Sequence, residues 1–95
     1  MEIKIAVIGL GSVGLPLARL FSTKYPTVGF DMNQHRVDEL MQGHDSTLEV
    51  SDELLGDAIH NHNFVCSTNL DDIRDCNFYV VAVPTPVDNN NHPDL

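Results

Sequence analysis

Three glycines near the amino terminus have the spacing of a phosphate-binding turn. Gly9, Gly11 and Gly14 form the pattern G-x-G-x-x-G directly after the apolar run at residues 3–8. Where a strand turns into a helix at such glycines, the free N–H groups of the helix start can bind a pyrophosphate. We expect Gly9 to allow the sharp turn, Gly11 to let the pyrophosphate approach the backbone, and Gly14 to let the helix pack tightly on the strand.

An acidic residue follows at the distance expected of a ribose-binding carboxylate. Asp31 lies 20 residues after Gly11, at the end of a second apolar run. A carboxylate there accepts hydrogen bonds from the adenosine ribose and repels a 2′-phosphate, which favours NAD over NADP. Arg36 leaves NADP open, because a nearby arginine can accommodate that phosphate. The alternative is that the glycines only shape a strand-to-helix turn.

Strand-like and helix-like patterns alternate along the chain and indicate an α/β fold. Strands are predicted at residues 3–8, 27–31, 64–67 and 78–83. Helices are predicted at residues 12–24, 33–42 and 51–61, with a short capped helix at 69–73. This order implies a Rossmann-type parallel sheet, with strand order 3-2-1-4 and flanking helices. The last strand is nearly all apolar, which is typical of a strand covered on both faces.

The composition limits the possible partners and the location. The chain has 95 residues, enough for one small domain, and a formal net charge of −9, which argues against nucleic acid or an anionic membrane surface as partner. It has no apolar run long enough to span a membrane, and we expect a cytoplasmic protein. His60 and His62 have no third ligand at a recognisable spacing, so we expect no metal site.

The two cysteines, Cys66 and Cys76, are expected to be separate thiols. In strand order 3-2-1-4 the third and fourth strands lie about 14 Å apart, at roughly 4.8 Å per spacing. A disulfide requires Cα atoms within about 7 Å of each other. We therefore interpret both residues as structural cysteines of the interior.

Four segments in order along the chain resemble a known enzyme family. They are residues 5–18 (IAVIGLGSVGLPLA), 28–31 (VGFD), 45–50 (DSTLEV) and 81–86 (VAVPTP). Together they resemble the UDP-glucose/GDP-mannose dehydrogenase family, above all its UDP-N-acetylglucosamine or N-acetylgalactosamine 6-dehydrogenase branch. The resemblance implies an NAD-dependent, cytoplasmic and homodimeric enzyme of bacterial polysaccharide biosynthesis. Such an enzyme oxidises the C6 alcohol of a UDP-sugar (UDP-GlcNAc, UDP-GalNAc or UDP-Glc) to a carboxylate through a cysteine-bound thioester.

The resemblance also implies where the cofactor lies. The pyrophosphate would be held by Gly9, Leu10, Gly11, Ser12, Val13 and Gly14. Asp31 would bind the adenosine ribose, Arg36 would lie beside the adenosine, and Thr85 would contact the nicotinamide half. Ser12 departs from the family, which usually has a tyrosine at this position, and the shorter side chain leaves a gap there.

The resemblance places the catalytic machinery beyond residue 95. The family's nucleophilic cysteine, its lysine and asparagine, and its sugar-nucleotide domain have no counterpart here, and Cys66 and Cys76 match none of them. We therefore expect residues 1–95 to be the amino-terminal part of an NAD-binding domain, truncated before its later strands. The alternative is a non-enzymatic nucleotide-sensing regulatory domain, which would not be expected to carry Pro84, Thr85 and Pro86. Neither the sugar nor the role of residues 43–63 follows from the sequence.

Overall fold

A parallel sheet of four strands organises the chain. The computed structural model describes residues 2–82, and the strands lie in the order β3-β2-β1-β4, which confirms the predicted sheet. The strands are β1 (Ile5–Ile8), β2 (Thr27–Phe30), β3 (Val65–Ser67) and β4 (Phe78–Val81). The helices are α1 (Gly14–Ser22), α2 (Gln34–Met41) and α3 (Asp52–Asn61), with a 3₁₀ turn η1 (Leu70–Ile73). Each observed element lies inside its predicted range.

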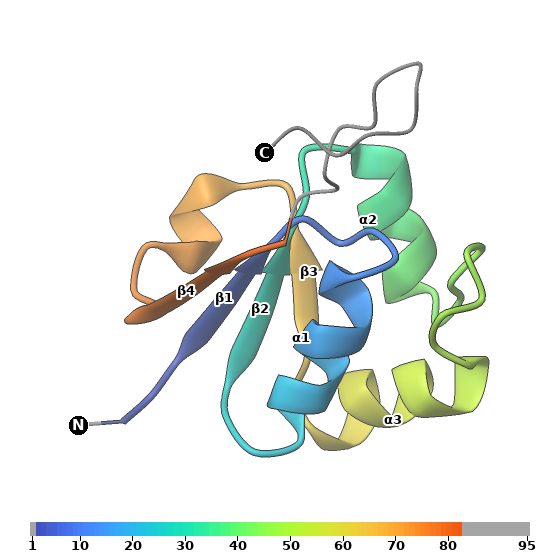
Figure 1. Cartoon of the computed structure of the whole chain (residues 1–95), viewed down its shortest axis with the longest axis horizontal. Coiled ribbons are helices and arrows are strands. Elements are labelled where there is room, and N and C mark those ends of the chain that lie inside the picture. Colours follow the sequence, from blue (N-terminus) through green and yellow to red (C-terminus); the bar gives the residue numbers. More distant parts are fainter. Residues whose placement is uncertain (1, 83–95) are drawn as a thin grey trace, which may run out of the picture.

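The two faces of the sheet carry cores of different size. Figure 1 shows α1, α2 and α3 on one face and η1 on the other. Successive side chains of a strand point to opposite faces. Accordingly, Ile5 and Val7 pack into the larger core under the three helices, whereas Ala6 packs with Ile73 and Cys76 under η1. The larger core positions α1 and α2 against the sheet.

Side-chain caps fix most of the helix starts. Asn33 accepts a hydrogen bond from the Arg36 N–H at the start of α2, and Ser51 accepts one from the Leu54 N–H at the start of α3. Asn69 caps η1 in the same way. Helix α1 differs, because its first flanking residue, Val13, makes no side-chain cap bond. The first N–H groups of α1 are therefore available to another acceptor.

Strand β4 is an exposed edge of the sheet. Phe78 is 54% exposed and Val81 is 64% exposed, and β4 pairs only with β1 among residues 2–82. The prediction that this strand is covered on both faces is wrong for the described part of the chain. The apolar pattern anticipates a covering layer, but within residues 2–82 only Val80 of β4 packs, partly buried, against the larger core, while Phe78, Tyr79 and Val81 are exposed. Tyr79 is anchored at its tip, since its hydroxyl donates to the Ile73 carbonyl at 2.6 Å.

Both cysteines are free and buried, as predicted. Cys66 lies in β3 and Cys76 precedes β4, so β2 and β1 separate them in the sheet. Burial raises the pKa of the Cys66 thiol to about 12 and also raises the pKa of Cys76. Neither group is an activated thiol nucleophile, because the reactive form is the thiolate.

Residues 2–82 contain neither a helix suited to a membrane nor a cluster of metal-binding side chains. No helix in this part of the chain is long and apolar enough to cross a membrane. No group of three or more histidine, cysteine or acidic side chains in the same range could hold a metal ion. His62 lies beside Asp57, with 3.2 Å between Nε2 and Oδ2.

The turn between β1 and α1 requires glycine at two positions for different reasons. Gly9 has φ of 98°, a left-handed conformation that costs glycine little. A Cβ atom built on Gly14 would lie 1.6 Å from the Gly9 carbonyl oxygen, so the helix contacts the end of the strand through backbone atoms. A Cβ atom on Gly11, in contrast, would meet no atom of the described chain within 4 Å. Close packing therefore depends on Gly14 and not on Gly11.

This difference predicts opposite outcomes for two alanine substitutions. Gly14→Ala should lower the free energy of unfolding by more than about 3 kcal/mol, because the methyl group would displace the Gly9 peptide. Gly11→Ala in the same turn is the matched control and should stay within about 1 kcal/mol of the wild type. Urea denaturation followed by circular dichroism measures both values, and a Gly14→Ala variant as stable as the wild type would contradict the close contact.

A candidate dinucleotide site at the carboxyl edge of the sheet

The ends of β1 and β2 bring the glycine turn and Asp31 side by side. Ile8 and Phe30 are register partners at the ends of these strands, and the Gly9 N–H donates to the Phe30 carbonyl at 2.8 Å. Leu10, which follows Gly9, and Asp31, which follows Phe30, therefore meet at the carboxyl edge of the sheet. In open α/β sheets, ligands bind outside this edge.

The Asp31 carboxylate is held in a fixed orientation. Its Oδ2 accepts a hydrogen bond from the Leu10 N–H at 2.9 Å, and its Oδ1 accepts one from the Asn33 N–H at 2.9 Å. The Asp31 N–H in turn donates to the Ser67 carbonyl at 3.1 Å. A carboxylate has about four lone-pair directions, so acceptor capacity remains for hydroxyl groups of a ligand.

Three successive N–H groups at the start of α1 have no acceptor in the described part of the chain. Within residues 2–82, the backbone N–H groups of Gly11, Ser12 and Val13 donate to no acceptor. The side chains of Ser12 and Val13 are exposed, so the turn is open to solvent. Free N–H groups at a helix start form an anion site, because the partial positive end of the helix dipole lies there.

Leu10 anchors this turn in the larger core under the three helices. Its side chain is fully buried and lies over Gly29 of β2. A Cβ atom on Gly29 would lie 2.8 Å from the Leu10 side chain and 3.3 Å from the ring of Phe64. The missing side chain at Gly29 therefore leaves the space that Leu10 fills.

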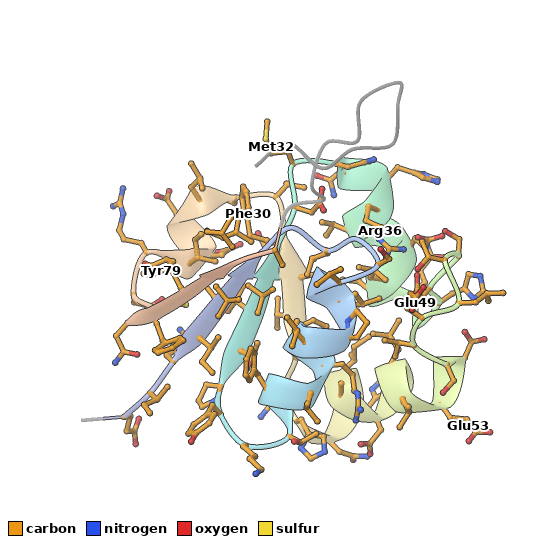
Figure 2. The ribbon with its side chains drawn as sticks, viewed as in Figure 1. Phe30, Met32, Arg36, Glu49, Glu53 and Tyr79 are labelled. Atoms are coloured by element: carbon orange, nitrogen blue, oxygen red, sulfur yellow. The ribbon has the colours of Figure 1, made fainter. Side chains whose placement is uncertain are left out.

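Arg36 holds the same residue from the other side. Its Nε donates to the Leu10 carbonyl at 2.8 Å, and its Nη1 donates to Glu39 and to Asp45, each at 2.8 Å. Figure 2 shows the side chain pointing from α2 toward the loop that carries Glu49. Only 11% of the side chain is exposed, and Nη2 is buried without a hydrogen bond to residues 2–82. The guanidinium group thus lies behind the glycine turn, within the protein.

Asp45 is a buried acceptor around which the loop at residues 45–50 folds. Its side chain is 0% exposed. It accepts hydrogen bonds from the N–H and hydroxyl of Thr47 and from the N–H groups of Glu49 and Val50. Burial opposes the charged form, but the bonds from Thr47, Arg36 and the backbone outweigh it and hold the pKa of Asp45 below its usual value. Asp45 is therefore an ionised partner for Arg36.

The structure brings most of the predicted site residues together. The carboxyl edge of the sheet brings together the glycine turn and the acid after β2, that is Gly9, Leu10, Gly11, Ser12, Val13, Gly14 and Asp31. Arg36 is adjacent but is bound to interior partners, and Thr85 lies outside the described residues. Asp45 and Glu39 were not among the predicted site residues. The sequence Asp45-Ser46-Thr47 after Gly43 is typical of a turn in which an aspartate accepts from the backbone two residues on.

The fold and this turn are those of a Rossmann-type α/β domain. Over residues 3–95 the chain matches the UDP-glucose/GDP-mannose dehydrogenase family, NAD binding domain. The chain belongs to this family, and the resemblance of its sequence motifs is confirmed.

Individual relatives agree with this assignment. The chain is 50% identical over 94 residues to the UDP-N-acetyl-D-glucosamine 6-dehydrogenase of Pseudomonas aeruginosa, covering 99% of this chain and 22% of the relative. It is 45% identical to the Salmonella typhi enzyme of the same name, with coverage of 99% and 21%. Its structure is similar to that of UDP-D-ManNAc dehydrogenase from Pyrococcus horikoshii, with a TM-score of 0.86, 28% identity and coverage of 97% and 22%. The chain thus spans about a fifth of the length of these relatives.

The buried ion pair predicts a specific dependence of stability on pH. The pKa of Asp45 is lower in the folded chain than its unperturbed value of 3.8. The stability that it contributes is therefore present above about pH 4 and is lost as the pH falls toward the folded pKa. We expect Asp45→Asn to remove up to about 1.4 kcal/mol per pH unit of this acid dependence.

Urea denaturation between pH 2.5 and 7 measures this slope. Asp75→Asn is the control, because Asp75 is exposed and pairs only with Lys4 among residues 2–82, at 2.7 Å. An exposed pair contributes little, so the control should retain the wild-type acid slope. An unchanged slope in Asp45→Asn would show that the Asp45 charge is not coupled to folding.

Proposed function

We propose that this chain binds NAD at the carboxyl edge of its sheet. The observation that carries the proposal is that three N–H groups without an acceptor in residues 2–82 lie beside a carboxylate of fixed orientation. The Leu10 N–H, which donates to Asp31 at 2.9 Å, connects the two groups. The turn formed by Gly9, Leu10, Gly11, Ser12, Val13 and Gly14 would hold the pyrophosphate. Asp31 would accept hydrogen bonds from the adenosine ribose, and Thr85 would contact the nicotinamide half. The matched family is described as an NAD binding domain, which supports this assignment.

The charges around the turn support NAD over NADP. A 2′-phosphate would face the Asp31 carboxylate, which repels it. Arg36 would have to neutralise that phosphate, but its guanidinium already binds Glu39, Asp45 and the Leu10 carbonyl. Recruiting it would leave two carboxylates without their cation. We therefore propose that Arg36 binds groups of the protein itself and does not bind a 2′-phosphate.

Calorimetric titration with NAD and NADP tests this selectivity. The wild-type chain should bind NAD more tightly than NADP, and Asp31→Ala should bind NAD at least about tenfold more weakly, since it loses the ribose acceptor and the Leu10 contact. Asp31→Asn is the matched variant, because it keeps the size and an acceptor oxygen but removes the charge. It should reduce the difference in affinity between NAD and NADP. Equal affinity of the wild type for both would refute the role of Asp31.

We further propose that the whole protein is a nucleotide-sugar 6-dehydrogenase. It would oxidise the C6 alcohol of a UDP-sugar (UDP-GlcNAc, UDP-GalNAc or UDP-Glc) to a carboxylate, with two NAD reduced per sugar, and supply polysaccharide biosynthesis. The names of the bacterial relatives, which are UDP-N-acetyl-D-glucosamine 6-dehydrogenases, support this choice. The cytoplasmic location is part of the proposal and is supported by the two unpaired thiols, which suit a reducing compartment. The homodimer stays a prediction for the whole protein.

The 95 residues by themselves should not catalyse this oxidation. Their cysteines are buried, and the raised pKa of the Cys66 thiol leaves almost no thiolate at neutral pH. We expect no UDP-GlcNAc-dependent formation of NADH, measured by its absorbance, above that of a reaction without the chain. Sugar-dependent NADH production by this polypeptide would contradict the absence of catalytic residues from the chain.

A further inference from the structure

A continuous chain of polar contacts joins the loop at residues 45–50 to the proposed cofactor turn. Asp45 binds Arg36 Nη1 at 2.8 Å, and Arg36 Nε donates to the Leu10 carbonyl at 2.8 Å. The Leu10 N–H then donates to Asp31 at 2.9 Å. Asp45 itself is 0% exposed and is linked to this turn by its contact with Arg36.

The direction of Arg36 depends on its buried partner. Arg36 has a second carboxylate, Glu39, but this residue lies on the same helix and its side chain is 16% exposed. Asp45 is fixed by four hydrogen bonds within its own loop, which it accepts from the N–H and hydroxyl of Thr47 and from the N–H groups of Glu49 and Val50. A guanidinium presents its donors in a rigid planar fork, so fixing Nη1 also fixes where Nε points. The more rigid of the two carboxylates therefore sets the position of the Nε–H that reaches Leu10.

Leu10 is the residue at which this chain of contacts meets the ligand-binding turn. Its peptide groups are bonded to Asp31 on one side and to Arg36 on the other, and the next three N–H groups along the chain are the free donors. A shift of the Leu10 carbonyl changes the direction of the adjoining Gly11 N–H, because the two groups belong to one planar peptide unit. Small displacements of such donors weaken binding of a phosphate.

We propose that Asp45 is a positioning residue for the cofactor site, which aims the first free N–H of the turn by holding Arg36 against the Leu10 carbonyl. This inference rests on the proposed NAD binding. The loop at residues 45–50 would then affect the affinity for NAD although it does not line the NAD site.

The test compares Asp45→Asn with a control in the same loop. Thr47→Val removes the hydroxyl that donates to Asp45 at 2.7 Å but leaves the Asp45–Arg36–Leu10 contacts in place. Calorimetry at neutral pH, well below the melting temperature of each variant, should give NAD binding about fivefold weaker for Asp45→Asn. Thr47→Val should bind within about twofold of the wild type, although both variants lower the melting temperature.

Amide hydrogen exchange in the chain without NAD tests the positioning separately from NAD binding. The Leu10 N–H should exchange about fivefold faster in Asp45→Asn than in the wild type or in Thr47→Val. The Ile5 N–H, which donates to the Pro26 carbonyl at 2.9 Å at the other end of β1, is the internal reference for a general loss of stability. If Asp45→Asn does not fold, Arg36→Lys replaces it, because lysine keeps the charge but not the fork that reaches Leu10.

The possible results separate the two proposals. A wild-type chain that binds no NAD would overturn the proposed function, while faster exchange of the Leu10 N–H in Asp45→Asn would still support the positioning role. Unchanged Leu10 exchange, or equal effects of Asp45→Asn and Thr47→Val on NAD affinity, would overturn the positioning role while leaving NAD binding intact.

Discussion

The fixation of Leu10 is the constraint on which the rest of the site depends. Its side chain is buried over Gly29, its N–H is bonded to Asp31 and its carbonyl is bonded to Arg36. Three independent parts of the chain, β2, the loop after β2 and α2, thus hold one residue of an otherwise open turn. A loop fixed in this way loses little conformational entropy when it binds a ligand, because the ordering has already occurred on folding.

The same arrangement explains how an acidic chain can bind a dinucleotide. The net charge is −9, yet the groups that would meet a pyrophosphate are free N–H groups and the end of a helix dipole. The acidic side chains near the turn are bonded to donors of the protein itself. Asp45 and Glu39 share the positive charge of Arg36 behind the turn, and Asp31 is bonded to two N–H groups. Local dipoles therefore decide the chemistry of this edge, and the average charge of the molecule does not.

The sequence predicted those parts of the fold and site that depend on short-range patterns. The turn at Gly9–Gly14, Asp31 and the sheet order all follow from spacing and element order, and the structure bears out the placement of these residues. The pairing of Arg36 with Asp45 and with the Leu10 carbonyl was not predictable, because it depends on how α2 and the loop at residues 45–50 pack. The exposure of β4 was misjudged for a related reason. An apolar strand suits burial on both faces, but its sequence does not say which segment covers it.

The two buried cysteines give the molecule natural reporters of local opening. Cys66 is 6% exposed in the edge strand β3, and Cys76 is 7% exposed beside η1, on the other side of the sheet. A protected thiol reacts with an alkylating reagent only when its surroundings open, so the two labelling rates measure the opening free energies of two different regions. Because Cys66 belongs to the larger core and Cys76 to the smaller core, comparing their rates distinguishes fraying of one face from unfolding of the whole sheet.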